Sequence, residues 1–598
     1  MQESGSSFAK WAFIVLGIFG LVYFGYPLVF GKGNGLTTQP LTLADWGTTP
    51  ETEGRTEASG CELNDGRAQF AFSTRGGAMT SARMVDAKYA QAVDKPDTRI
   101  ELVSTAREQR MPLRTSLRAS GEAAQQVDFD NLDFQLASSD TSSCTFVHKT
   151  ANAEITKVVS LSGRPFELDV SVTVKNLASE PKRHRYAIEQ TSWRSEKETS
   201  ASIWDLGRRP EWMTDVVSHT TKGTNRHLVT DYEPSDFSPK DGFTDEHFLR
   251  AEGDGVWAGV SANYFANVVF HKAGPAQPAA ETLIEDGNYY QLKPGTPLYG
   301  HMYRARLAYP ERELAPNESV SYESIAYVGP KEREVLAAVG GAEAKRLDAL
   351  GLIDLGMFGF IGKYFVAYVG VLHDLVGSWG WAIALLTITV KILVFPLQIP
   401  QLGSSVKMRR LKPKVDAINA KYGDDMTQKA LAMQEVRELY GKEGVNQFIG
   451  CLPMLLQFPV WIALYQALGT AVELYHAPFL LPLIPDLTHA DPYHVIPIVL
   501  GASSFLQQKL MPMQGVDPAQ AKMMLYLMPG MFMAMMFFLP AGLGVYMLTN
   551  TWVGITQQAL TERWMKSKLK TPAPIEVREV KKTTETPTLG KGKVRARG

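Results

Sequence analysis

The 598-residue sequence predicts a membrane-embedded α-helical bundle joined to a large all-β domain. Three observations indicate this fold class. Several apolar runs are long enough to span a bilayer, short alternating segments fill the first half of the chain, and a charged helical stretch separates two of the runs. A chain of this length exceeds one ordinary hydrophobic core, so at least two domains are expected.

The first apolar run, residues 11–30, contains twenty uncharged residues, enough to cross a bilayer. A secretory signal has a shorter apolar core and ends in a small-residue cleavage site, whereas GYPLVFGKGNG follows here. We therefore expect an uncleaved anchor, transmembrane helix 1, after a short N-terminal segment at 1–10.

Residues 31–350 change character. Segments such as AQFAFST (68–74), FELDVSVTVKN (166–176) and GVWAGVSANYFANVVF (255–270) alternate apolar and polar residues between Gly, Asn, Asp and Pro clusters. This pattern predicts a large antiparallel β domain of sandwich type that ends in a helical connector. Its tryptophans could line a ligand cleft, but filling the core is the simpler interpretation: Trp193, Trp204, Trp212 and Trp257.

Two of the three cysteines, Cys61 and Cys144, lie in this β region, and Cys451 lies in an apolar run. If the region is exported, an oxidising compartment permits a Cys61–Cys144 disulfide, but two unpaired thiols fit equally well. No cysteine and histidine spacing suggests a metal site, and no glycine loop suggests a bound phosphate. We expect neither a metal nor a cofactor.

The second half of the chain alternates apolar and polar stretches. An amphipathic helix interrupted by Lys363, His373 and Asp374 is expected to lie in the membrane interface. The expected order is: amphipathic helix 351–378, transmembrane helix 2 at 379–399, charged helical hairpin 400–447, transmembrane helix 3 at 448–471, loop 472–492, transmembrane helix 4 at 493–510, loop 511–522, transmembrane helix 5 at 523–541, transmembrane helix 6 at 542–562 and basic tail 563–598.

Charge sets the expected orientation. The hairpin region 404–447 has nine Lys and Arg, and the stretch from Arg563 to the end has eleven, whereas loop 472–492 has none. Positive charge is retained on the cytoplasmic side, so hairpin, tail and N-terminus are expected inside and the β domain outside. The hairpin should close through two apolar stripes, Leu411, Val415, Ile418 and Tyr422 against Leu431, Val436, Leu439 and Tyr440.

One full charge, Lys391, interrupts the apolar run 379–397. If the helix leaves the membrane near Gln401, Lys391 lies roughly 15 Å inside, further than a lysine stem readily reaches. An ammonium at the bilayer centre costs roughly 2.5–3.5 kcal/mol, so it needs water or a partner. A buried polar cavity around Lys391 is the favoured interpretation. The alternative is that its side chain reaches the headgroups by snorkelling, with local thinning of the bilayer. Thr387 lies one turn away on the same face.

Other polar side chains, and a group of flexible methionines, also lie in or near the expected spans. Gln457, Tyr546 and Asn550 lie in or near the spans and could line one wet concavity, or simply bond between helices. The fifth span has seven methionines, and flexible thioether side chains accept many apolar partners. Met528, Met531 and Met535 are therefore candidates for a hydrophobic slide, although ordinary packing would also explain them.

Several motifs in this order resemble the YidC membrane protein insertases. They are ALLTITVKILVFPL, KMRRLKPKVDAINAKYGDD, IGCLPMLLQFPVWIALYQAL, AVELYHAPF and LPAGLGVYMLTNTWVGITQQAL, within about 352–563, and, more weakly, FSTRGG at 72–77. The resemblance implies a five-helix insertase core with a groove open to the cytoplasm and lipid. It also implies a periplasmic β-supersandwich domain similar to sugar mutarotases.

By position, Lys391 takes the place of the family's groove arginine, and Thr387, Gln457 and Tyr546 fall at groove-lining positions. The lysine keeps the charge but loses the planar fork that binds carboxylates bidentately. Met547 stands where many relatives have a second aromatic residue, which weakens the interpretation of an aromatic clamp.

The sequence thus predicts an insertase and chaperone of the inner membrane, without covalent chemistry. Expected partners are nascent membrane proteins, the Sec translocon and its accessory subunits, the ribosome, the signal recognition particle with its receptor, and lipids; no DNA is expected. The hairpin would receive ribosomes or targeting factors through Lys407, Arg409, Arg410, Lys412 and Lys414. Two alternatives are an ion or proton transporter that uses the intramembrane lysine and a membrane-tethered periplasmic carbohydrate-active protein.

Overall fold

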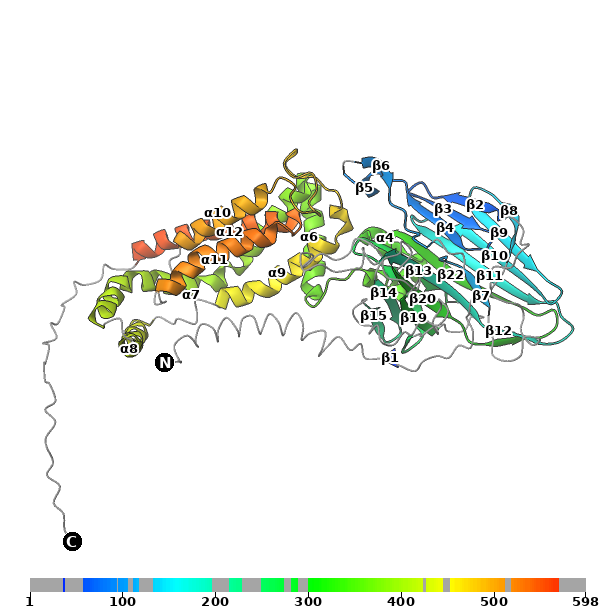
Figure 1. Ribbon diagram of the computed structural model, residues 1–598, viewed down its shortest axis with the longest axis horizontal. Coiled ribbons are helices and arrows are strands. Elements are labelled where there is room, and N and C mark those ends of the chain that lie inside the picture. The colour runs from blue at the N-terminus through cyan, green and yellow to red at the C-terminus, as the bar shows by residue number, and fades with distance from the viewer. Residues whose placement is uncertain are drawn as a thin grey trace, which may run out of the picture.

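The computed structural model describes residues 36–37, 58–93, 95–105, 111–117, 133–195, 215–227, 249–273, 281–288, 300–422, 426–444, 452–510 and 518–568. Figure 1 shows an all-β domain at one end of the molecule and a helical bundle at the other. The predicted all-β domain is confirmed. The expected anchor at 11–30 and the tail beyond residue 568 lie outside the described residues.

Two antiparallel sheets form the body of the β domain. The larger has the strand order β15-β14-β17-β18-β22-β11-β10-β9-β8, and the smaller has the order β1-β16-β19-β20-β13-β7. Strands β13, β19 and β20 of the smaller sheet pack against β14, β17 and β18 of the larger. This face-to-face packing makes the predicted sandwich.

The strands of the larger sheet are β8 (Gln135–Ser139), β9 (Ser143–Lys149), β10 (Ala153–Leu161), β11 (Glu167–Asn176), β14 (Asp215–Thr220), β15 (Gly223–His227), β17 (Gly255–Ser261), β18 (Phe265–His271) and β22 (Ser319–Pro330). Those of the smaller sheet are β1 (Leu36–Thr37), β7 (Thr115–Leu117), β13 (Tyr186–Ser195), β16 (Leu249–Ala251), β19 (Glu281–Asn288) and β20 (Gly300–Ala308). Two strand pairs stand apart, β5 (Ala90–Ala92) with β6 (Lys95–Arg99) and β12 (Lys182–His184) with β21 (Arg312–Leu314).

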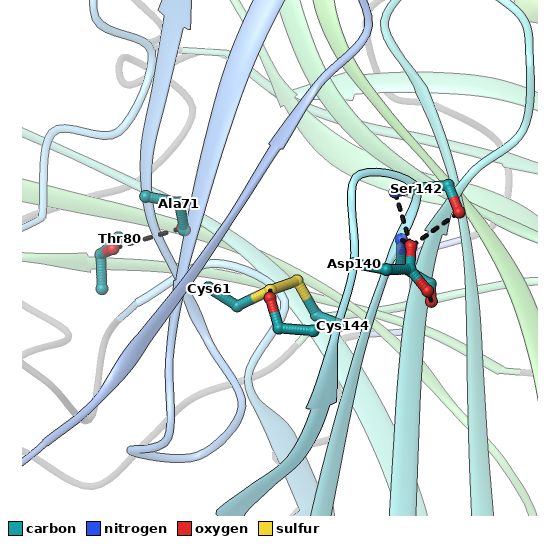
Figure 2. The surroundings of a disulfide bond; sticks show 8 residues. Cys61, Ala71, Thr80, Asp140, Ser142 and Cys144 are labelled. Atoms are coloured by element: carbon teal, nitrogen blue, oxygen red, sulfur yellow. Dashed lines mark hydrogen bonds between the residues drawn. A yellow bond between two sulfur atoms is a disulfide. The ribbon is translucent and has the colours of Figure 1, made fainter.

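A small sheet of β2 (Gly60–Asn64), β3 (Ala68–Ser73) and β4 (Met79–Met84) is joined covalently to the larger sheet. Cys61 of β2 and Cys144 of β9 form a disulfide across 83 positions of sequence, and Figure 2 shows it between the two sheets. The structure therefore pairs the two cysteines whose state the sequence left open. A cross-link over so long a loop restricts the unfolded chain and favours the folded domain.

Burial in the strands follows their position in the sandwich. Strand β11 alternates as predicted, because one of its faces meets the core. Strands β17 and β18 are instead buried throughout, so segment 255–270 is a hairpin covered on both sides rather than one alternating strand. The helical connector covers the face of this hairpin that the smaller sheet does not cover. There, the indole nitrogen of the fully buried Trp257 donates to the Leu347 carbonyl at 3.0 Å.

The turn after β3 holds the FSTRGG motif. Gly76 and Gly77 have φ angles of 68° and 57°, and a Cβ on Gly77 would lie 2.9 Å from Cδ of Lys157. Lys157 is fully buried on β10, and its ammonium donates to the Leu113 carbonyl. Burial lowers the pKa of Lys157 to about 7.

The helices are α4 (Arg333–Ala338) and α5 (Ala344–Leu347) in the connector, then α6 (Gly359–Val376), α7 (Trp379–Lys421), α8 (Met426–Lys442), α9 (Leu452–Thr470), α10 (Val495–Leu510), α11 (Pro518–Met536) and α12 (Ala541–Lys568). Helix α7 runs without a break through the predicted span and the first arm of the hairpin. At the expected boundary near Gln401 the side chains thus change from apolar to polar, while the backbone stays helical.

The predicted hairpin of α7 and α8 closes through Leu411, Val415, Val436 and Tyr440, which form a small core of their own. Leu431 is the exception, because its side chain is 54% exposed. Tyr422 also contributes by hydrogen bonding rather than packing, since its hydroxyl donates to Glu435 at 2.7 Å.

Two described stretches, Gly359–Val376 and Trp379–Pro396, are long and apolar enough to cross a membrane. Helices α9, α10 and α12 overlap the expected spans, whereas α11 (Pro518–Met536) begins inside the expected loop 511–522 and ends before residue 541. The count of six spans stays a prediction. Helix α6 buries Gly362, Val366, Val369 and Leu372 on one face. The opposite face exposes Phe360, Tyr364, Tyr368, Val371 and Leu375, the apolar surface that an interfacial helix presents to lipid.

The buried ammonium of Lys157 predicts a pH-dependent stability. Its pKa is lowered on folding, so the unfolded chain binds more protons between about pH 7 and 10, and stability should rise with pH across that window. Lys157→Met should remove this component, worth at most about 1.4 kcal/mol per pH unit. The measurement is thermal unfolding of the full chain in detergent against pH. Exposed Lys222→Met is the control; an unchanged slope in Lys157→Met would contradict the assignment.

Candidate functional site

The cation predicted to matter most lies inside the helical bundle. The bundle core combines apolar residues of α6, α7, α9, α10, α11, α12 and loop 472–492. Lys391 on α7 follows the core residue Val390 and is itself only 9% exposed, whereas Ile392 and Leu393 are 63% and 72% exposed. Within the described part of the chain, no carboxylate forms an ion pair with its ammonium.

A polar stripe on α12 faces this position. Tyr546, Asn550 and Gln557 are spaced four and seven residues apart and therefore share one side of the helix. The amide nitrogen of Gln557 donates to the Lys391 carbonyl at 3.3 Å, which fixes the stripe against α7. Tyr546 is 2% exposed, and the amide oxygen of Asn550 is buried without a hydrogen-bond partner among the described residues. Buried polar atoms usually have a hydrogen-bond partner. The unsatisfied amide oxygen of Asn550 is therefore consistent with a surface that binds water or a ligand.

Thr387 lies on the predicted face of α7, but its hydroxyl hydrogen is already used in a hydrogen bond within its own helix. Its side chain is buried, and the hydroxyl donates to the Ile383 carbonyl of its own helix at 2.7 Å. The oxygen can therefore only accept from a neighbour. The fourth expected member, Gln457, belongs to α9, but its side chain lies outside the described residues.

The methionines of α11 differ in exposure. Met531 is 53% exposed, whereas Met528 and Met535 are half-buried. Met533 packs against Gly501 of α10: a Cβ on Gly501 would lie 2.9 Å from the sulfur of Met533. The helix thus has a packed side and an exposed side, and Met531 lies on the exposed one.

The basic residues expected to meet a ribosome or targeting factor lie on the first arm of the hairpin. Lys412 is exposed, and Lys407, Arg410 and Lys414 are partly exposed. Lys414 pairs with Glu443 of the second arm at 3.4 Å. The side chain of Arg409 lies outside the described residues.

The sequence did not reveal how the β domain docks on the bundle. Tyr475 of loop 472–492 packs among Tyr89, Tyr264 and Phe265 of the β domain, with ring centroids 5.2–6.1 Å apart. The Asn263 amide donates to the Gly469 carbonyl at 2.6 Å. The only available signal was the aromatic AVELYHAPF stretch, whose partner surface is assembled by the fold.

A cavity of about 400 Å³ lies at this junction. Connector residues, α6 and the end of α9 line it, and the charged members are Lys331, Arg333, Asp348, Lys363 and Glu473. Glu473 bridges the two parts, because its carboxylate accepts from the backbone amide of Arg333 at 3.2 Å.

Comparison with known proteins places this geometry in a family. The model for the YidC periplasmic domain matches residues 62–368, and the model for the 60Kd inner membrane protein matches 371–568. The membrane protein insertase YidC of Anaeromyxobacter dehalogenans is 33% identical over 515 residues, covering 84% of each chain. This chain belongs to the YidC family of membrane protein insertases.

Two further matches also involve YidC insertases. The YidC insertase of Pseudoalteromonas atlantica is 42% identical over 245 residues, covering 41% of this chain and 43% of its own. A solved structure described as an active YidC insertase with its first transmembrane domain resolved covers 92% of this chain at 15% identity and a TM-score of 0.36. Membership of the YidC family confirms the resemblance stated from the sequence motifs.

A buried charge without a paired acid should cost stability. Lys391→Leu should raise the thermal unfolding temperature of the purified chain in detergent, by an amount equivalent to at most about 2 kcal/mol, because the mostly buried side chain leaves its ammonium less hydrated than in bulk water. Ile392→Leu, at an exposed position on the same helix, should change little. A marked loss of stability in Lys391→Leu alone would indicate that the ammonium is paired.

Proposed function

We propose that this chain inserts integral membrane proteins into the inner membrane and helps them fold, alone or with the Sec translocon. The observation that carries this proposal is the burial of Lys391 against the polar stripe of α12 inside an otherwise apolar bundle. A cation beside several polar side chains would form a hydrophilic groove within a hydrophobic scaffold.

The groove lowers the cost of carrying polar groups across the membrane. A client's short polar or acidic tail loses hydration when it enters lipid, and a wet surface that bears a cation offsets part of that loss. Lys391 attracts acidic tails, while Tyr546, Asn550, Thr387 and Gln457 offer hydrogen bonds. No covalent step is required.

The apolar helix of the client leaves along the third and fifth spans into lipid. The exposed Met531 supports α11 as part of this route, because a flexible thioether adapts to side chains of different shape. Met528 and Met535 would extend the same surface. The exposed apolar face of α6 supports its place in the outer interface.

The arrangement of the ends supports the proposed topology. Loop 472–492 packs against the β domain, whereas Figure 1 shows α8 at the far end of the bundle from that domain. A periplasmic β domain thus puts the basic hairpin in the cytoplasm, where the ribosome, the signal recognition particle or its receptor would meet Lys407, Arg410 and Lys412. Both termini are cytoplasmic in this scheme.

The rival functions lack support of this kind. A proton relay would need an acidic partner for Lys391, and within the described bundle no acid pairs with it. A carbohydrate-active β domain would need histidines and carboxylates brought together. Instead, His184 bonds to Tyr322 at 2.8 Å and His271 bonds to Tyr309 at 3.1 Å, both as buried pairs within the sandwich.

The test compares clients in cells that depend on this chain. Lys391→Ala should reduce insertion of single-span clients with acidic exported tails by roughly tenfold, the effect of about 1.4 kcal/mol. The same clients with neutral tails should be affected less, and Lys391→Arg should restore insertion. Ile392→Ala is the matched control on the lipid-facing side. Normal insertion of acidic-tailed clients by Lys391→Ala would contradict the proposal.

A further inference from the structure

We propose that His476, Asp486 and His489 form a binding site for one divalent transition-metal ion of the zinc class, on the loop that docks the β domain. One potential ligand atom from each residue lies within 4.8 Å of the other two. We expected no metal site, because the sequence has no spacing typical of one. The folded loop brings the three residues together from positions ten and thirteen apart.

The distances place one carboxylate oxygen between two imidazoles. Oδ2 of Asp486 lies 2.6 Å from Nδ1 of His476 and 2.7 Å from Nδ1 of His489. Two imidazole nitrogens and a carboxylate oxygen suit zinc, whereas calcium and magnesium prefer oxygen ligands alone. An ion at about 2.0–2.2 Å from each atom would replace these two contacts and move the imidazoles slightly away from Oδ2.

The hydrogen bonds of His476 favour a metal at this centre. Its Nδ1 faces the Asp486 carboxylate, and its Nε2 faces the Ala90 carbonyl of β5 at 3.1 Å. Both neighbours only accept hydrogen bonds, whereas a neutral imidazole has one N–H to donate, so the ring must either carry a second proton or bind a cation through one nitrogen. With an ion on Nδ1, the remaining N–H donates to Ala90, which is the usual arrangement of a metal-binding histidine.

Asp486 is already oriented for the same role. Its other oxygen, Oδ1, accepts from the backbone amide of Thr488 at 2.7 Å and from the Thr488 hydroxyl at 2.6 Å. These bonds hold the carboxylate and leave Oδ2 directed at the histidines. The His476 and Asp486 side chains are 8% and 7% exposed, while that of His489 is 31% exposed and provides an entry route.

The site would couple two parts of the molecule. His476 belongs to the loop of the helical bundle, and its second nitrogen meets the carbonyl of Ala90 in the β domain. An ion that fixes the His476 ring would therefore also fix this contact. The proposal does not depend on client insertion.

The test titrates Zn²⁺ into the full-length chain, purified without a histidine tag in detergent and stripped of metal with a chelator. Calorimetry should give one tight site per chain, and zinc should raise the thermal unfolding temperature. His489→Gln and Asp486→Asn should each weaken binding by about two orders of magnitude, because each removes one of three ligands. X-ray absorption of the zinc-bound chain should show two imidazole ligands.

His373→Gln is the matched control. His373 and Asp374 also form a histidine and carboxylate pair, at 3.5 Å, but His373 stacks on Trp379 and lies outside the cluster. This variant should bind zinc like the unmodified chain. Since His489 is the most exposed member, His489→Gln should keep its zinc-free unfolding temperature, which separates lost binding from misfolding. No tight site in the unmodified chain, or equal binding by Asp486→Asn, would overturn the proposal.

Discussion

An ammonium ion in an apolar helical bundle constrains everything placed around it. Lys391 cannot be left in contact with hydrocarbon alone, because the cost of its desolvation is several times thermal energy. The bundle meets this requirement by turning the polar stripe of α12 toward α7 at the same level, with Gln557 bonded to the backbone of Lys391 itself. The apolar side chains Ile392 and Leu393 occupy the opposite, exposed side of α7. One helix thus presents a polar face inward and an apolar face outward.

The two ends of the bundle are built differently, which gives the polar face a direction. At the end beside the β domain, loop 472–492 contributes Leu474, Ala477, Phe479, Ile484 and Leu487 to the bundle core. Asp491 caps α10 there, since its carboxylate accepts from the Ile496 amide at 2.7 Å. At the other end, α7 continues into a charged hairpin with a small core of its own. A packed end and a polar end are what a groove open to one side requires.

Much of this architecture could be predicted from local patterns. Alternation identified strands such as β11, and apolar periodicity identified the hairpin contacts of Leu411, Val415, Val436 and Tyr440. A buried charge in an apolar run was visible as Lys391 without any structure. Local patterns failed where the fold decides burial. Strands β17 and β18 are covered on both faces by elements distant in sequence. The docking of Tyr475 and the His476, Asp486 and His489 cluster depend on the same long-range assembly. The assignment of Leu431 to the stripe was wrong for a local reason, because a residue five positions before Val436 lies on another face of the helix, and its side chain is exposed.

The most direct test of the central claim is the access of water to the face that bears Lys391. Asn550→Cys would be introduced in a chain with Cys451→Ser, which leaves the Cys61–Cys144 disulfide intact. Inside-out membrane vesicles would be treated with a charged maleimide, which reacts only with hydrated thiols. Ile392→Cys, at the exposed apolar position, is the control. The account predicts labelling at 550 from the cytoplasmic side and little at 392. Absence of labelling at 550 would contradict it.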